Sequence, residues 1–353
     1  MAGIIHRLAF EQPIFELKAR LDKLESATAH SVEAHDEIRL LRKELTRLKK
    51  KVYSELKPWE VVQVARHPDR PMTTDYLELT FDQFVELHGD KAFSDDRAMR
   101  TGFAKLNQYK VMVVGHQKGK TLKERNACFF GCAHPEGYRK AMAKMRLAAK
   151  YHIPVICLID TPGAYPGIGA EERGQAQMIA NNLFEMSRLR TPILCVVIGE
   201  GGSGGALGIG IGDCVAVLEH AYYSVISPEG CAGILWKSAA HAEQAAHALK
   251  LTSKDLYRLG VIDDVIEEPL GGAHRDPHLM AARLKMYLLH HLRELVDRPI
   301  DEVVEARYNK FRRMGVFLEG LESQVGDDAA MMPESTAGGE DHLPQDSHTA
   351  RRA

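Results

Sequence analysis

The sequence has few of the features that identify membrane, secreted or nucleic-acid-binding proteins. Its 353 residues contain no apolar run of about 18 residues, so no membrane-spanning helix is predicted. The 46 Lys and Arg residues nearly balance the 48 Asp and Glu residues, and the net charge of −2 gives no general attraction to nucleic acid or membrane. The first residues lack the charged and then apolar order of a signal peptide. These absences predict a cytoplasmic globular protein.

Cysteine is also scarce, and its spacing suggests neither a metal site nor a disulfide framework. Three of the six cysteines lie in apolar, strand-like runs, where cysteine behaves as a small hydrophobic residue: Cys157, Cys195 and Cys214. Cys128 and Cys132 are close together, but no second pair follows at the spacing of a zinc site. We therefore expect no metal ion and no disulfide in this chain.

Three regions of different composition follow one another along the chain. Residues 1–70 contain two stretches with apolar residues at spacings of three and four, separated by a polar segment at 26–35. This pattern predicts a helical hairpin that ends in a proline-marked linker. Residues 71–320 alternate apolar runs with amphipathic stretches, which predicts an α/β domain with a mostly parallel sheet. Residues 321–353 are polar and aperiodic and predict a disordered tail.

The alternation in the second region predicts individual elements. Strands are expected at 110–115, 153–159, 192–198, 214–218, 223–226 and 261–266. Helices are expected at 74–87, 135–152, 171–189, 239–249, 253–259, 278–296 and 301–313.

Two of the predicted strands run directly into segments that are dense in glycine. The first segment is Asp160-Thr-Pro-Gly-Ala-Tyr-Pro-Gly-Ile-Gly169, and the second is Gly199-Glu-Gly-Gly-Ser-Gly-Gly-Ala-Leu-Gly208. Glycine at this density lets backbone N–H groups approach a ligand, and a helix after each turn would direct its first amides at the same point. Neither segment contains His, Lys or Cys. The pattern therefore favours a site that stabilises an oxyanion with amides over one that uses a side-chain base.

The second glycine segment also matches a dinucleotide-binding fingerprint. Gly199, Gly201 and Gly204 have the required spacing, and Glu219 lies about 20 residues beyond the first glycine, where a ribose-binding acid is expected. That fingerprint normally opens the first βαβ unit of a domain, whereas several βα units precede this one. The match is therefore the weaker interpretation.

A nucleophile elbow is a second match in the same segment. Ser203 occupies the nucleophile position, and Asp264 followed by His274 or His278 gives the order of an α/β-hydrolase triad. Histidines are plentiful in this chain, and a small residue such as Ser203 also suits a tight turn. The hydrolase interpretation is kept as an alternative.

The first glycine segment continues through Asp160–Gln175, and four other segments accompany it in the sequence. They are Phe10-Glu-Gln-Pro-Ile14, Pro135-Glu-Gly-Tyr-Arg-Lys140, Gly199–Ala206 and Tyr223-Ser-Val-Ile-Ser-Pro-Glu-Gly-Cys-Ala232. Together these segments resemble the family of carboxyltransferase alpha subunits of acetyl-CoA carboxylase, over roughly residues 4–318. The resemblance implies a crotonase-type ββα superhelix, with the helical hairpin at the amino-terminal end and helices at the carboxyl-terminal end.

The resemblance also implies a reaction and its partners. The carboxyl group of carboxybiotin, which is attached to a separate biotin carboxyl carrier protein, is transferred to acetyl-CoA to give malonyl-CoA, the first committed step of fatty acid synthesis. The active site lies between alpha and beta subunits in an α2β2 assembly, so the chain is expected to be active only with a beta subunit. The beta subunit supplies a zinc ribbon and an oxyanion hole for acetyl-CoA. Biotin carboxylase is the further partner, and no nucleic acid or membrane is expected.

In this family, backbone amides hold the ureido oxygen of biotin, which makes the biotin nitrogen a better leaving group. The residues to which the resemblance gives this catalytic role are Gly204, Gly205 and Ala206. The residues that it places in the substrate-binding pocket are Gly163, Ala164, Tyr165, Gly167, Gly201, Gly202 and Ser203.

One stretch departs from the family pattern, which usually has basic residues followed by Arg-Asn-Phe-Gly-Met. This chain has Lys120-Thr-Leu-Lys-Glu-Arg-Asn-Ala-Cys-Phe-Phe-Gly-Cys-Ala-His134. Lys118, Lys120 and Lys123 are candidates for contact with the phosphates of coenzyme A, but exposed lysines are more often only solvated, so none is assigned to the site. A carboxyltransferase for another acyl-CoA and a non-catalytic scaffold stay open as further alternatives.

Overall fold

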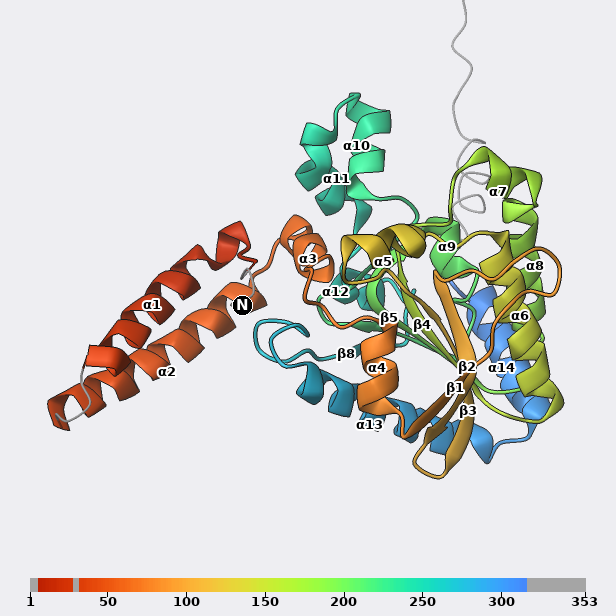
Figure 1. Cartoon of the computed structure of the whole chain (residues 1–353), viewed down its shortest axis with the longest axis horizontal. Helices are drawn as coiled ribbons and strands as arrows, with labels where there is room; N and C mark the ends of the chain where they lie inside the picture. Colours follow the sequence, from red (N-terminus) through yellow and green to blue (C-terminus); the bar gives the residue numbers. More distant parts are fainter. Residues whose placement is uncertain (1–5, 28–31, 316–353) are drawn as a thin grey trace, which may run out of the picture. The chain divides into compact units, whose positions relative to one another are not determined.

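The computed structural model describes residues 6–27 and 32–315 (Figure 1). The predicted tail at 321–353 lies outside the described residues, and the domain boundary at residue 70 stays a prediction. Within the described ranges, no helix is both long enough and apolar enough to cross a membrane.

The amino-terminal helices form the predicted hairpin. After a 3₁₀ turn, η1 (Ala9–Glu11), helix α1 (Gln12–Ala27) runs alongside α2 (Val32–Ser54) (Figure 1). Their seam includes buried Ile14, Leu21 and Leu41, as the spacing of three and four predicts. Helix α2 begins at Val32, inside the segment that was expected to be the turn.

The segment after the hairpin differs from the prediction. Helix α3 (Pro58–Ala65) precedes the linker, and α4 (Thr73–Thr80) follows it. The helix predicted for 74–87 is wrong beyond Thr80, because strand β1 (Gln83–Glu86) pairs antiparallel with β2 (Met99–Leu106). Pairing with a distant strand outweighs the local helical pattern here.

All eight strands of the described residues form one mixed sheet. Seven of them follow the order β1-β2-β3-β4-β5-β6-β8, and β7 pairs with the carboxyl end of β5. The remaining strands are β3 (Tyr109–His116), β4 (Val155–Thr161), β5 (Ile193–Gly202), β6 (Cys214–Leu218), β7 (Tyr222–Ser224) and β8 (Asp264–Ile266). Strands β1 to β3 are antiparallel, and β3 to β8 are parallel to one another. The parallel part corresponds to the strands predicted from apolar runs, whereas β1 and β2 were not predicted.

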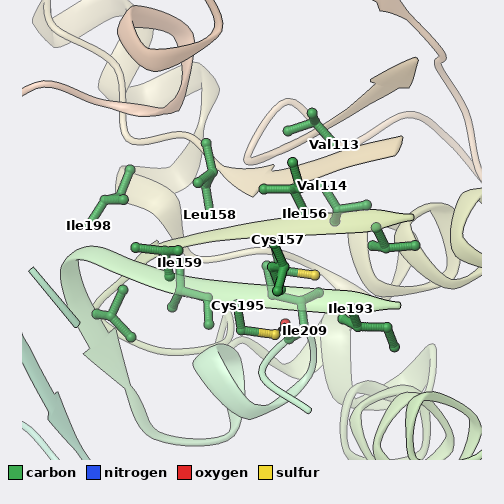
Figure 2. Close-up of a cluster of buried hydrophobic side chains, with 14 of the residues drawn as sticks. Val113, Val114, Ile156, Cys157, Leu158, Ile159, Ile193, Cys195, Ile198 and Ile209 are labelled. Atoms are coloured by element: carbon green, nitrogen blue, oxygen red, sulfur yellow. Dashed lines mark hydrogen bonds between the residues drawn. The ribbon is translucent and has the colours of Figure 1, made fainter. Parts of the chain in front are cut away.

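The core of the sheet lies at β4 and β5, in which every residue is buried. Figure 2 shows their aliphatic side chains packed with those of β3 and with Ile209. Cys157 on β4 is in register with Cys195 on β5, and both are free thiols within this apolar cluster. They behave as the small hydrophobic residues that the sequence predicts.

The remaining helices of the described residues lie on the sheet or beside it. They are α5 (Leu122–Ala127), η2 (Phe129–Gly131), α6 (Pro135–Lys150), α7 (Ile168–Glu172), α8 (Gln175–Ser187), α9 (Ser203–Leu207), α10 (Pro228–Trp236), η3 (Ala239–His241), α11 (Ala242–Leu249), α12 (Ser253–Arg258), α13 (Pro277–Val296) and α14 (Ile300–Arg312). The helix predicted for 171–189 is divided in two, because Gly174 has a φ of 81° and its left-handed conformation ends α7 before α8 begins.

A buried ion pair joins α14 to the start of β5. The guanidinium of Arg307, on α14, donates two hydrogen bonds to Asp213, at 2.8 and 2.7 Å. Its other N–H groups donate to the carbonyl oxygens of Met186, Leu189 and Thr191. Asp213 also accepts a hydrogen bond from the amide of Ile193, at 2.7 Å. Every donor of this arginine therefore has a partner.

Candidate active site

The two glycine segments lie against each other at one edge of the sheet. They begin in the last residues of β4 and β5, which are neighbouring parallel strands, and Thr161 pairs in register with Gly201. The hydroxyl of Thr161 donates to the carbonyl of Gly163 at 2.8 Å and accepts from its amide at 3.1 Å. The convergence that the sequence predicts for these segments is therefore present.

The second segment differs from the expected turn. Gly199–Gly202 continue β5 as extended strand, and α9 begins immediately afterwards at Ser203. Ser203 makes the change of direction with a φ of 51°, which is unfavourable for a residue with a side chain. Since the first glycines form a strand and not a phosphate-binding turn, the dinucleotide interpretation is not favoured. Glu219 instead accepts a hydrogen bond from the amide of Glu268, at 3.1 Å.

Close backbone packing explains two of the glycines. A Cβ on Gly202 would lie 2.1 Å from the carbonyl oxygen of Pro162, and a Cβ on Gly205 would lie 2.5 Å from the amide nitrogen of Ala164. A Cβ on Gly204 would meet only the Ile179 side chain, at 3.5 Å, which is ordinary contact. The backbone of 162–164 therefore lies directly on one side of α9.

In the described part of the chain, the first amides of α9 make no hydrogen bond to another element of the fold. Among the described residues, the N–H groups of Gly204, Gly205 and Ala206 donate to no acceptor outside this short helix. The carbonyl of Gly205 is held from the other side, because it accepts a hydrogen bond at 3.2 Å from the hydroxyl of buried Tyr138, on α6. A fixed set of amides without partners is suited to an anionic oxygen.

The hydrolase triad is not assembled. Asp264 accepts a hydrogen bond from Tyr287 at 3.1 Å and lies 3.3 Å from His291. The ring of His274 stacks on that of His67 with 3.9 Å between centroids. In the part of the chain that the structure describes, Ser203 Oγ has no hydrogen-bonded histidine. The alternative that uses Ser203 is therefore not favoured.

The remaining pocket residues form a wall on the first glycine segment. The Tyr165 ring stacks on His134, with centroids 4.1 Å apart, and meets Phe129 edge to face. Its backbone is held as well, because the amide donates to the carbonyl of Ala133 at 3.0 Å. Gly167 passes so close to this ring that a Cβ there would lie 2.4 Å from Tyr165 Cε1. The wall is therefore rigid and aromatic.

A buried charge network joins the two strand ends. Lys118 Nζ lies 2.6 Å from Asp160 Oδ1 at the end of β4 and 2.5 Å from Glu200 Oε2 on β5. The same Asp160 oxygen accepts the amide of Glu200 at 2.9 Å. Burial alone would lower the pKa of Lys118, but the two carboxylates raise it above its ordinary value. Burial likewise opposes ionisation of Glu200, yet Lys118 and Arg66 lower its pKa to about 2.

The network extends to the linker after α3. Arg66 donates to Glu200 at 2.6 Å and pairs with Glu229 at the start of α10. The hydroxyl of Tyr222, on β7, donates to Glu200 at 2.6 Å. Glu200 is therefore the common acceptor for three side chains from separate parts of the chain.

This network was not predicted from the sequence. Lys118, one of the candidate phosphate-binding lysines, is committed to the carboxylates, and Lys120 pairs with Asp75. Among the described residues no ion pair is present for Lys123, which is exposed. The available signal was that Asp160 and Glu200 each interrupt the end of an apolar strand, and a carboxylate there requires a cationic partner.

An apolar cavity of about 460 Å³ opens beside Ser203 and Gly204. Leu207, Val225 and Phe311 are among the residues that form its walls. The amino end of α9 therefore has an apolar hollow beside Gly204.

Comparisons with known proteins agree with this geometry. Residues 7–315 match the family described as acetyl co-enzyme A carboxylase carboxyltransferase-like. The chain is 67% identical over 312 residues to the acetyl-coenzyme A carboxylase carboxyl transferase subunit alpha of Rhodopirellula baltica, covering 88% of this chain and 98% of that one. It is 52% identical over 313 residues to the subunit of the same name from Methylococcus capsulatus, covering 88% and 98%.

Solved structures share the fold at lower identity. Transcarboxylase 12S, with methylmalonyl-coenzyme A and methylmalonic acid bound, gives a TM-score of 0.50 at 21% identity and covers 65% of this chain and 44% of that chain. The geranyl-CoA carboxylase beta subunit of P. aeruginosa gives 0.51 at 17% identity and covers 70% and 46%. The chain therefore spans less than half the length of these structures, and the likeness shows the crotonase fold alone.

Proposed function

The chain belongs to the family of acetyl-CoA carboxylase carboxyltransferase alpha subunits, and from this premise we propose how its glycine site serves carboxyl transfer to acetyl-CoA. The observation behind the proposal is the set of amides at the start of α9, which have no acceptor outside that helix and are held between Tyr138 and the backbone of 162–164. Fixed amides suit an oxygen that gains negative charge during the reaction.

The site residues fit a biotin-linked carboxyl donor. Gly204, Gly205 and Ala206 donate their amides to its ureido oxygen and stabilise negative charge there. When bound, carboxybiotin supplies the carboxyl group that malonyl-CoA retains. Removal of one such donor from an oxyanion hole typically costs about 3 kcal/mol of transition-state stabilisation.

The walls of the site position the donor. We assign Gly163, Ala164, Tyr165 and Gly167 to one side of the biotin pocket, and Gly201, Gly202 and Ser203 to its floor. The aromatic stack of Tyr165 on His134 and the close approach at Gly202 support this assignment, since both restrict movement of the lining backbone.

The partners follow from the same premise. We propose that the chain works in an α2β2 assembly with a beta subunit that supplies the acetyl-CoA oxyanion hole, together with a biotin carboxyl carrier protein and biotin carboxylase. Zinc is assigned to the beta subunit, and the reaction requires no metal from this chain. The cytoplasmic location stays a prediction from the sequence. The relatives' name, subunit alpha, supports a multi-subunit enzyme.

Two neighbouring glycines provide a matched test. Gly205→Ala forces a Cβ against the backbone of Gly163 and Ala164, whereas Gly204→Ala has room for its Cβ. In the complex with the beta subunit, we expect Gly205→Ala to lower malonyl-CoA decarboxylation with biocytin as acceptor by about 100-fold or more. Gly204→Ala should stay within a few-fold of the parent chain, because its Cβ displaces no backbone and the amides keep their positions.

Assembly and folding are measured in parallel. Size-exclusion chromatography reports binding of the beta subunit, and thermal unfolding reports the fold of each variant. Full activity of a folded, assembled Gly205→Ala complex would disprove the proposed site. A parent complex without activity would instead direct attention to another acyl-CoA substrate or to a scaffold.

A further inference from the structure

The last turns of α13 place three metal-binding side chains together, on elements that the glycine site does not use. The ligand atoms of His290, His291 and Glu294 all lie within 4.8 Å of one another. His290 Nε2 is 3.5 Å from Glu294 Oε1, and His291 Nδ1 is 3.6 Å from Glu294 Oε2. Neighbouring ligands of a tetrahedral zinc ion are separated by about 3.4 Å when each bond is about 2.1 Å long.

The buried face of His291 has the surroundings of a metal-binding imidazole. Its Nε2 lies 3.3 Å from Asp264 Oδ2, and the hydroxyl of Tyr287 donates to the same oxygen at 3.1 Å. A ligating histidine characteristically donates its second N–H to a carboxylate, which fixes the tautomer and the ring orientation. Here that arrangement directs the lone pair of Nδ1 toward Glu294.

A thiol borders the same nitrogen. Cys214 Sγ, at the start of β6, lies 3.5 Å from His291 Nδ1. The carboxylate neighbours are Asp263 and Asp264, and Lys310 neutralises only Asp263, at 2.8 Å. The local charge therefore favours a cation.

We propose that His290, His291 and Glu294 bind a divalent transition-metal ion of the zinc class, with Asp264 and Tyr287 orienting His291. Two imidazoles and one carboxylate match zinc, whereas magnesium and calcium prefer oxygen ligands alone. Three protein ligands leave one position for water. The site joins the end of α13 to β8. It departs from the expectation of no metal, which rested on cysteine spacing and overlooked the helical pattern His-His-x-x-Glu.

The test is titration of the full chain with Zn²⁺ by calorimetry and with Co²⁺ by visible absorbance. We expect one tight site per chain and a tetrahedral Co²⁺ spectrum. His290→Ala should lose both signals, and this side chain is 65% exposed, so its removal does not threaten the fold. The matched control is His247→Ala on α11, an exposed histidine four residues after Glu243 that belongs to no such cluster in the described residues.

A second variant examines the supporting residues. Asp264→Asn keeps all three ligands but removes the carboxylate that orients His291, and we expect about 10-fold to 100-fold weaker binding. The proposal is overturned if His290→Ala binds the metals as the parent does. It is equally overturned if His247→Ala loses as much affinity, or if Asp264→Asn leaves the affinity unchanged, because either result indicates only surface binding by exposed histidines.

Discussion

The two ends of β5 both contain buried charges, but they are organised differently. At the amino end, Arg307 and Asp213 form a closed pair in which all five guanidinium N–H groups are used. At the carboxyl end, Glu200 collects Lys118, Arg66 and Tyr222, and Arg66 continues to Glu229. The first arrangement is sealed from solvent, whereas the second borders a pocket of about 250 Å³.

This difference suggests that the two ends of β5 have different roles, one in stability and the other in function. A sealed pair with one cation and one anion holds a helix on the sheet, and removal of either partner leaves an uncompensated buried charge. A branched network gives each cation a second carboxylate, so one loss is partly compensated. We infer that the amino end of β5 maintains the fold and the carboxyl end positions the glycine site.

The largest expected effect is on stability and comes from the sealed end. Arg307→Met removes the partner of Asp213, whose side chain is 4% exposed, and should lower the free energy of unfolding by about 3–5 kcal/mol. Urea unfolding followed by circular dichroism measures it. Arg312→Met, at an exposed position of the same helix, is the control and should change stability by less than about 0.5 kcal/mol. Equal losses of stability in Arg307→Met and Arg312→Met would show that the buried ion pair does not stabilise the fold.

At the branched end, Glu200→Gln should affect activity more than stability. Lys118 keeps Asp160 and Arg66 keeps Glu229, so we expect a loss of only about 1–3 kcal/mol of stability. The strand end that precedes α9 loses its common acceptor, and a shift of its backbone should lower kcat of the assembled enzyme by about 10-fold to 100-fold.

The control for that variant is Glu229→Gln, which removes a partner of Arg66 alone and should reduce kcat by only a few-fold. A Glu200→Gln complex with unchanged kcat would show that the network is structural, like the pair at the other end.

A smaller effect at the carboxyl end of β5 depends on pH. The pKa of Glu200 is about 2 in the folded chain, against an ordinary value of 4.5, so its stabilisation is complete above pH 4.5 and is lost as the pH falls toward 2. The stability difference between the parent chain and Glu200→Gln should therefore shrink over that interval. Urea unfolding at pH 5, 4 and 3 measures this difference. A difference that grows as the pH falls would contradict the assigned charge state.

The smallest expected effect is that of Ser203→Ala. The hydroxyl has no histidine partner among the described residues, and the amides of α9 are unchanged. Carboxyl transfer should stay within about threefold of the parent, because Ala and Ser tolerate a φ of 51° equally poorly. Complete loss of an esterase activity in this variant would revive the hydrolase alternative.

The parallel part of the fold was predictable from the sequence because its strands are buried on both faces. The resulting apolar runs at β4 and β5 stand out without any knowledge of their neighbours. Strand β1 was not predictable in this way, since its residues are partly exposed and its state is decided by pairing with β2. The break at Gly174 required a backbone conformation that a single glycine in a helical pattern does not reveal.

Part of the candidate site could likewise be predicted from the sequence, and part could not. The glycine-rich segments could be predicted to meet, because each comes at the end of a predicted strand and neighbouring parallel strands end at the same edge of a sheet. The partners of Glu200 could not be inferred, since Arg66 and Lys118 are 134 and 82 residues away from it in sequence. Only the folded chain shows which charges neutralise one another.

The hydrogen bond from Tyr138 to the carbonyl of Gly205 has a geometric consequence for the peptide that follows. A trans peptide is planar, so its C=O and N–H groups point in opposite directions. The carbonyl of Gly205 and the N–H of Ala206 belong to the same peptide plane. A hydrogen bond that fixes the carbonyl therefore also fixes the direction in which this N–H points. The phenol of Tyr138 therefore fixes the direction of the Ala206 N–H, although it does not contact that amide.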